Sequence, residues 1–249
     1  MSEVNKFSNL GYEKFRELAL QEGISRHEKV GFPDEYREGK EEAIFADMLA
    51  KLPSLGSTGS VVLEIGPGCS HLPLKLAELC AARGNTLLWA DSAEMLAHLP
   101  DAPYIAKFAG RYPDLDGLFE AHIGKIRTII AYSLIQYVFT EGNLWDFLDR
   151  SLSLLADGGE MLLGDIPNVT MRKRFFASAA GAASHRQYTG RDEKPPASFN
   201  NIEPGQIDDS VALAILARAR AQGFHAWILP QAPSLPMANR REDILLRKP

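Results

Sequence analysis

The run from Val61 to Ser70, VVLEIGPGCS, constrains the fold of this chain more than any other segment. Apolar residues typical of a strand lead through the acidic Glu64 into a turn that contains Gly66 and Gly68, and a helical pattern follows. This order predicts a buried parallel strand that presents a ligand-binding loop at its carboxyl end, as in open α/β sheets. Glycines in such a loop let the backbone approach a ligand more closely than a Cβ would allow.

A dinucleotide-binding loop is the main alternative, because it also joins a strand to a helix. Its fingerprint, G-x-G-x-x-G, places a third glycine where this chain has His71. A pyrophosphate at the helix N-terminus would also lie close to the acidic Glu64, which suits an ammonium group better. The residues therefore count against a dinucleotide-dependent oxidoreductase or epimerase, which stays the alternative function.

A second acidic residue follows at the spacing that an adenosine ligand requires. Residues 86–91 are predicted to form the next strand, and Asp91 lies 25 residues beyond Gly66. A carboxylate there can accept hydrogen bonds from both ribose hydroxyls of an adenosine ligand. Asp91 could instead cap the helix that follows, and the two roles are compatible.

These features resemble the class I S-adenosylmethionine-dependent methyltransferases, whose first motif reads acidic-x-Gly-x-Gly-x-Gly. Glu64, Gly66 and Gly68 match that motif, and Ser70 replaces the third glycine. The segments 91–96, DSAEML, and 155–163 extend the resemblance, which covers roughly residues 60–249. It implies S-adenosylmethionine as cofactor and S-adenosylhomocysteine as product. The cofactor-binding residues that it implies are Glu64, Gly66, Pro67, Gly68, Ser70, Asp91, Ser92, Met95, Tyr132 and Ser133.

Alternating strand and helix patterns predict an α/β, Rossmann-like fold with a mostly parallel seven-stranded sheet. Strands are expected at 61–65, 86–91, 104–108, 127–132, 160–164, 224–229 and 242–246, and the resemblance implies that the last two form an antiparallel edge hairpin. Residues 1–58 are expected to form an N-terminal helical cap and linker, and residues 59–249 the catalytic domain. Ser70 is the expected N-cap of the helix after the glycine loop, and Gly84 its end.

The N-terminal region contains one clear helical repeat. Phe45, Met48, Leu49 and Leu52 follow the spacing of a helix with one buried face. In the resembling family such N-terminal helices often cover the cofactor cleft. Arg37, just before this repeat, is a candidate for contact with the cofactor carboxylate or the substrate.

Substrate recognition is expected from an insertion at about 166–209, which has no sheet pattern and is long for a loop in a compact domain. Its aromatic and basic residues suit an anionic or sugar-bearing small molecule. His185 in this insertion is the preferred general base, and Asp165 is the second candidate, as base or substrate orienter. The predicted substrate-binding residues are Arg37, Gln136, Tyr137, Asn168 and Arg172.

Composition limits the classes of partner and the cellular location that the sequence allows. A net charge of -5 argues against nucleic acid, and no apolar run has the length of a membrane helix. The N-terminus lacks the apolar core of a secretory signal, and the two cysteines, Cys69 and Cys80, have no metal-binding or disulfide spacing. A cytoplasmic protein with a small-molecule substrate and without a metal is therefore expected.

The sequence thus predicts methyl transfer from S-adenosylmethionine to a small molecule. The run GFPDEYREG at 31–39 faintly resembles methyltransferases of bacterial surface-glycan pathways, which makes a hydroxyl of a sugar or nucleotide-linked sugar the expected acceptor. A non-catalytic S-adenosylmethionine-binding module is a further alternative, which predicts cofactor binding without turnover.

Overall fold

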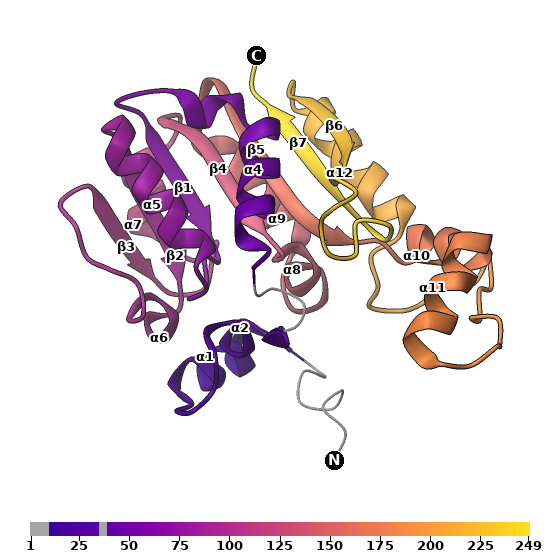
Figure 1. The fold of residues 1–249 in the computed structure, drawn as a ribbon. Coiled ribbons are helices and arrows are strands. Elements are labelled where there is room, and N and C mark those ends of the chain that lie inside the picture. The colour runs from indigo at the N-terminus through magenta and orange to yellow at the C-terminus, as the bar shows by residue number, and fades with distance from the viewer. Residues whose placement is uncertain (1–9, 35–38) are drawn as a thin grey trace.

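The computed structural model describes residues 10–34 and 39–249. A seven-stranded sheet with the order β3-β2-β1-β4-β5-β7-β6 lies at its centre (Figure 1). The strands are β1 (Val61–Ile65), β2 (Thr86–Asp91), β3 (Ile105–Ala109), β4 (Ile126–Tyr132), β5 (Leu155–Pro167), β6 (His225–Pro230) and β7 (Arg241–Arg247). β7 runs antiparallel to β5 and β6, and the other neighbouring pairs are parallel. The predicted sheet with an antiparallel edge hairpin is confirmed.

The largest difference from the expected strands is in β5. It begins at Leu155 rather than at residue 160, because Leu155 pairs with Ile126 before the register between β4 and β5 shifts. It also continues to Pro167, beside β7. Asp165, which was expected to end the strand, therefore lies within β5 close to its carboxyl end.

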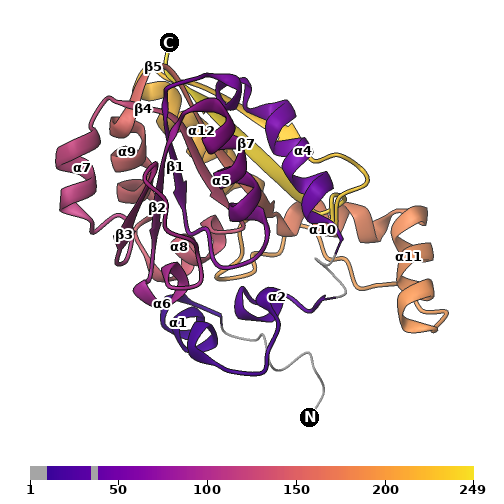
Figure 2. The same ribbon diagram turned by 60° about the vertical axis from the view of Figure 1, so that its left-hand side comes forward.

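The two faces of the sheet are covered by different helices, as Figure 2 shows from the side. On β1, Val62 belongs to the core on one face, while Leu63 and Ile65 belong to the core on the other, as the twofold period of a strand requires. The first face is covered by α4 (Glu41–Lys51) and α5 (Leu72–Arg83). The second is covered by α7 (Asp116–His122), α8 (Ile135–Glu141), α9 (Leu144–Leu154) and α12 (Asp209–Ala221).

Helix α4, within the predicted N-terminal cap and linker, packs on the sheet. Its buried side chains are Ile44 and Met48, and Leu52 follows them, after which η2 (Pro53–Gly56) leads towards β1. Leu49, predicted to be buried, is 37% exposed, so the buried face is rotated from the predicted one towards Ile44. The cap over the carboxyl edge of the sheet consists, in the described residues, of α1 (Tyr12–Leu20) and α2 (Arg26–Lys29), close to α6 (Ala93–Leu96) (Figure 1).

The insertion at 166–209 contains two helices where a loop was expected. It forms α10 (Val169–Ala177) and α11 (Ala179–Thr189), followed by an extended segment that leads to α12. Figure 1 shows α10 and α11 beyond the β5 and β7 side of the sheet, away from α1 and α2. Across the described residues, the structure contains no helix with the length and apolar character needed to cross a membrane.

Candidate functional site

A pocket of about 430 Å³ lies at the carboxyl ends of β1, β2 and β4. The strand order reverses between β1 and β4, and ligands of open α/β sheets bind at such switch points. Helices α1 and α2 contribute Tyr12, Phe15 and His27 to its wall, so the pocket is enclosed between the sheet edge and the cap.

The glycine loop forms the floor of this pocket. Gly66 and Gly68 have φ angles of +66° and +63°, which favour glycine, and the backbone N–H of Gly66 donates to the carbonyl of Ala90 across 2.8 Å. A Cβ on Gly68 would lie 2.5 Å from Cγ1 of Val30 in the cap. Glycine at position 68 therefore allows the cap to close directly onto the loop.

Ser70 lines the pocket but is not the N-cap of α5, as the sequence had predicted. The N-cap is His71, whose side chain makes no capping hydrogen bond, and Pro occupies the first turn. The predicted end of this helix is confirmed, since Gly84 takes a left-handed conformation there with φ of +64°.

Asp91 lies at the end of β2 with its carboxylate held by the backbone. One oxygen accepts from the N–H of Gly68 at 3.0 Å, and the other accepts from the N–H of Ser92 at 2.7 Å. Burial raises the pKa of Asp91 to about 6, and the two backbone donors partly oppose this shift. Each oxygen keeps a lone pair beyond its backbone bond, so the carboxylate can still accept from a ligand in the pocket.

The residues after Asp91 hold the start of the next helix. Ser92 is the N-cap of α6 and accepts from the N–H of Met95 at 3.2 Å, so Asp91 is not the capping residue. Met95 is buried, lines the pocket and packs with Phe15 and Val30 of the cap. This segment therefore joins the pocket wall to the cap.

Glu64 is the second acidic group in the pocket wall. It is 3% exposed, and the indole N–H of Trp89 donates to its Oε2 at 2.9 Å. Burial raises the pKa of Glu64 to about 7. A cationic group in the pocket would favour the ionised form, so this carboxylate is suited to an ammonium partner.

The end of β4 supplies Tyr132 and Ser133 to the wall. Ser133 has a φ of +55°, and its hydroxyl donates to Asp165 on the neighbouring strand. The carboxylate of Asp165 is also held by the guanidinium of Arg241 at 2.9 Å and lies 3.4 Å from Nε2 of Gln231. Asp165 itself does not line the pocket, and it contacts the wall through Ser133.

The cap is fixed over the pocket by polar and aromatic contacts. Arg16 of α1 pairs with Glu94 of α6 at 2.6 Å, and the ring of Phe15 meets the ring of Tyr137 edge to face at 4.9 Å. The N–H of Tyr12 donates to Glu141 at 3.0 Å. Sequence reasoning missed the cap aromatics, although their spacing in residues 12–15 places them on one helix face.

Three comparisons with known proteins bear on this arrangement. No protein-family profile matches the chain. Chondramide synthase from Chondromyces crocatus is 27% identical over 179 residues, which are 68% of this chain and 4% of that protein. A probable nonribosomal peptide synthetase, CymA, from Salinispora arenicola (strain CNS-205) is 29% identical over 120 residues, 47% of this chain and 2% of that protein. The chain therefore spans a few per cent of the length of these curated relatives.

Solved structures match over almost the whole chain. The plantazolicin methyltransferase BpumL, in complex with a monoazolic desmethylPZN analogue and S-adenosylhomocysteine, has a TM-score of 0.58 and 13% identity, and the match covers 95% of this chain and 98% of that one. The N-methyltransferase NodS from Bradyrhizobium japonicum WM9 has a TM-score of 0.55 and 14% identity, and the match covers 96% of this chain and 98% of NodS. The CurJ carbon methyltransferase has a TM-score of 0.53 and 16% identity, and the match covers 92% of this chain and 62% of that one. This chain has the class I methyltransferase fold.

Within the methyltransferase fold, most of the predicted cofactor residues surround the pocket. Its wall contains Glu64, Gly66, Pro67, Gly68, Ser70, Asp91, Met95, Tyr132 and Ser133, and of the predicted substrate residues it contains Tyr137. Ser92 lies beside it and holds Asp91. Gln136 donates to the carbonyl of Ser133 at 2.8 Å and does not line the wall.

The predicted residues of the insertion lie elsewhere in the methyltransferase fold. Asn168 caps α10 and donates to Glu242 at 2.6 Å, and Arg172 pairs with Glu203 on the surface at 2.9 Å. His185 packs edge to face on Phe176, with ring centroids 6.3 Å apart. Described residues beyond Phe147 contribute nothing to the pocket wall. Arg37 lies outside the described residues.

At two further positions the sequence departs from the pattern that is common in the resembling family: at the start of the fourth strand and directly after the third. Arg127, at the position where the family commonly has an acid, donates to the carbonyl of Asp157 at 3.0 Å, away from the pocket. After β3, residues 110–114 line the pocket wall, and the acidic residue among them is Asp114, five positions beyond the end of the strand.

Proposed function

We propose that this chain is a methyltransferase that transfers the methyl group of S-adenosylmethionine to a small molecule. The observation that carries the proposal is the pair of carboxylates in one pocket beside the glycine loop, the buried Glu64 and the partly exposed Asp91. The fold supports it, and so do BpumL and NodS, which were crystallised with S-adenosylhomocysteine.

The two carboxylates suit different ends of the cofactor. Asp91 accepts hydrogen bonds from the ribose hydroxyls, for which its remaining lone pairs are available, and Glu64 accepts from the ammonium group of the methionine moiety. A dinucleotide would instead place a pyrophosphate close to Glu64, where the repulsion would be unfavourable. Glu64 therefore favours S-adenosylmethionine over NAD, whereas Asp91 would suit the ribose of either ligand.

Methyl transfer is an in-line displacement on the methyl carbon of the sulfonium. A bond forms from the acceptor to the methyl carbon while the carbon–sulfur bond breaks, and the electron pair stays on sulfur. A hydroxyl acceptor passes its proton to a general base within hydrogen-bond reach, either a group of the pocket wall or a water molecule. The chain contributes alignment and exclusion of water, for which α1 and α2 close the pocket above the glycine loop.

For the acceptor, we propose a hydroxyl of a sugar or a nucleotide-linked sugar. The support comes from the resemblance of residues 31–39 to methyltransferases of surface-glycan pathways, in a segment of which 35–38 lie outside the described residues. NodS is described as an N-methyltransferase and CurJ as a carbon methyltransferase, so the neighbours do not select an acceptor atom. A cytoplasmic location and a partner other than nucleic acid belong to the same proposal, and the net charge of -5 supports the latter.

The two predicted general bases, His185 and Asp165, lie at different places relative to the pocket, so we give them different roles. A general base must come within hydrogen-bond reach of the proton that it removes. His185 lies outside the pocket wall, so we do not carry it into the proposed mechanism. For Asp165 we propose an indirect role, in which its carboxylate fixes the hydroxyl of Ser133 at the pocket wall.

The test is incubation of the protein with methyl-labelled S-adenosylmethionine and a panel of acceptors: nucleotide-linked sugars, free sugars, small amines and short peptides. Labelled sugar product that is absent with Asp91→Ala supports the whole proposal. Label in an amine or peptide alone retains the methyltransferase and overturns the sugar acceptor. Binding of S-adenosylhomocysteine without label transfer to any class would favour the non-catalytic module.

A further inference from the structure

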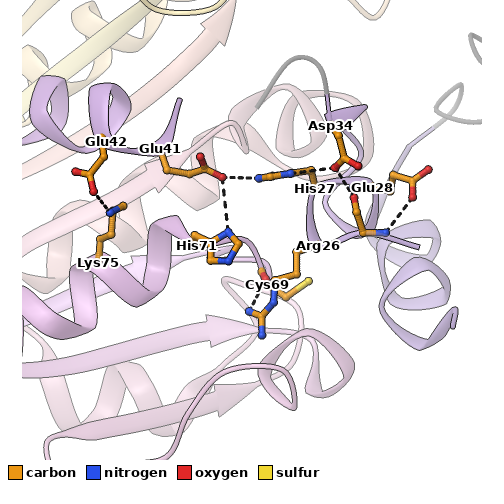
Figure 3. Close-up of polar contacts among 10 residues, drawn as sticks. Arg26, His27, Glu28, Asp34, Glu41, Glu42, Cys69, His71 and Lys75 are labelled. Carbon is orange, nitrogen blue, oxygen red and sulfur yellow. Dashed lines mark hydrogen bonds and ion pairs between the residues drawn. The ribbon is translucent and has the colours of Figure 1, made fainter. Parts of the chain in front are cut away.

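A cluster of two histidines and two acidic residues lies at the rim of the pocket, apart from Glu64 and Asp91. His27 comes from α2, Glu41 is the first residue of α4, and His71 immediately precedes α5 (Figure 3). Asp34 contacts His27 from the opposite side. The fold therefore brings together residues from the cap and from both helices on one face of the sheet.

The ligand atoms of the first three residues converge on one point. Nε2 of His27 contacts Oε1 of Glu41, and Nδ1 of His71 lies 3.9 Å from the same oxygen. All three ligand atoms lie within 4.8 Å of one another. Metal–ligand bonds of about 2.0–2.2 Å separate neighbouring ligand atoms by roughly 3–4 Å, so small side-chain shifts are enough to hold an ion.

Asp34 prepares His27 for this role. Its Oδ1 lies 3.1 Å from Nδ1 of His27 and accepts from the hydroxyl of Ser25 at 2.6 Å. A metal-binding histidine commonly donates its other ring N–H to a carboxylate, which fixes the ring and its tautomer. With that proton on Nδ1, the lone pair of Nε2 faces the Glu41 carboxylate, and two acceptors in contact require a proton or a metal ion between them.

We propose that His27, Glu41 and His71 bind one divalent transition-metal ion of the Zn²⁺ type, with Asp34 as the carboxylate that orients His27. Two imidazole nitrogens and one carboxylate oxygen favour Zn²⁺ or Fe²⁺ over Mg²⁺ and Ca²⁺, which prefer oxygen ligands alone. This metal site replaces the expectation of a chain without a metal.

The position of the cluster has two consequences for a bound ion. It would join the cap to α4 and to the start of α5, because each contributes one ligand. His27 and Glu41 line the pocket, and the side chain of His71 is 58% exposed, so the remaining coordination positions are open to water or to an oxygen of a bound molecule. The site does not depend on the reaction that the pocket performs.

The metal-free alternative is a hydrogen-bonded tether in which protonated His27 joins Asp34 to Glu41. In that arrangement His71 makes no hydrogen bond to Glu41, since their 3.9 Å separation exceeds hydrogen-bond length, and it contributes only a longer ion pair. His71 therefore distinguishes the two. It is suitable for substitution, because its side chain is exposed and makes no capping hydrogen bond.

The experiment is calorimetric titration of chelator-treated, full-length protein with ZnCl₂, with and without excess MgCl₂. The variants are His71→Ala, Glu41→Gln and Asp34→Asn, and the control is His225→Ala, which removes an exposed histidine on β6. We expect one Zn²⁺ per chain in wild type and in the control. Asp34→Asn should lower the affinity about 10–100-fold, as the loss of such orienting partners typically does, and the two ligand variants should lower it further.

A second readout is the visible spectrum after Co²⁺ substitution, which reports nitrogen ligation directly and should change in His71→Ala. Melting curves without metal confirm that each variant is folded. The metal site is overturned if wild type shows no saturable binding at one ion per chain, if His71→Ala binds Zn²⁺ as wild type does, or if Mg²⁺ competes equally.

Discussion

Asp91 and Asp165 occupy similar positions at the carboxyl edge of the sheet, yet their surroundings differ. Asp91 is held by two backbone N–H groups and lines the pocket. Asp165 is surrounded by the side chains of Ser133, Gln231 and Arg241 and lies behind the wall. A carboxylate at a strand end is therefore available to a ligand where the backbone holds it, whereas side-chain partners give it a structural role.

The same contrast separates the two helical additions to the sheet. The cap helices α1 and α2 contribute side chains to the pocket, whereas α10 and α11 contribute none. Charged groups in the insertion pair among themselves, as Arg172 does with Glu203 and Arg174 with Asp209 at 2.5 Å. Length and charge made the insertion the expected recognition element, but many of its charges are already paired.

The largest effect is expected from Asp91→Ala. Removing the carboxylate eliminates two hydrogen bonds from ribose hydroxyls to a charged acceptor, each contributing about 1.5–3 kcal/mol. We expect affinity for S-adenosylhomocysteine to fall about a hundredfold or more, measured by calorimetry. Asp101→Ala, which changes an exposed aspartate, is the matched control, and an equal loss there would contradict the role of Asp91.

The corresponding change behind the pocket wall is Asp165→Asn. It leaves the largely buried Arg241 without its anionic partner, and breaking such a pair costs about 3–5 kcal/mol. We expect the free energy of unfolding in urea to fall by about 3 kcal/mol while cofactor affinity changes little. A variant that unfolds like wild type but no longer binds cofactor would contradict the structural role of Asp165 and place it with Asp91 in cofactor binding.

A smaller effect tests the closure of the cap onto the glycine loop. Gly68→Ala introduces a Cβ close to Val30 at a φ of +63°, and a strained residue of this kind costs about 1–3 kcal/mol. The free energies of unfolding of Gly68→Ala, Val30→Ala and the double variant separate the cost of the contact with Val30 from the cost of the positive φ. Val30→Ala should recover the part due to the contact, and purely additive effects would show that the cap does not press on the loop.

The acidity of the pocket predicts a pH dependence of cofactor binding. Burial raises the pKa of Asp91 to about 6 and that of Glu64 to about 7, and each must be ionised to bind its partner group. Affinity for S-adenosylhomocysteine should therefore fall as the pH drops through 7 and 6, by up to about tenfold per unit for each group that becomes protonated. Calorimetric titrations of Asp91→Asn should no longer show the fall in affinity near pH 6. An affinity of wild type that does not change with pH would contradict the roles assigned to Asp91 and Glu64.

The smallest effect is expected from His185→Ala. His185 lies on α11, outside the pocket wall, so turnover and cofactor affinity should equal those of wild type. A rate assay with the acceptor found in the panel measures this. Loss of turnover with unchanged cofactor affinity would restore His185 as the base and require the insertion to approach the pocket during the reaction.

The sheet and the cofactor residues were predictable because local signals and topology agree there. The apolar strand from Val61, the glycines and Asp91 each carry a local pattern, and parallel strands bring their carboxyl ends together. The cap contacts were not predictable, since Phe15 meets Tyr137 only through tertiary packing. The pairing of Asp165 with Arg241 joins two strands far apart in sequence, and no local pattern indicates it.

The most direct test of the central account is one calorimetric comparison on the wild-type protein, with S-adenosylhomocysteine and NAD as separate ligands. Glu64 and Asp91 beside the glycine loop predict saturable binding of S-adenosylhomocysteine at one molecule per chain and no measurable binding of NAD. Preferential binding of NAD, or of neither ligand, would contradict the assignment of this pocket to S-adenosylmethionine.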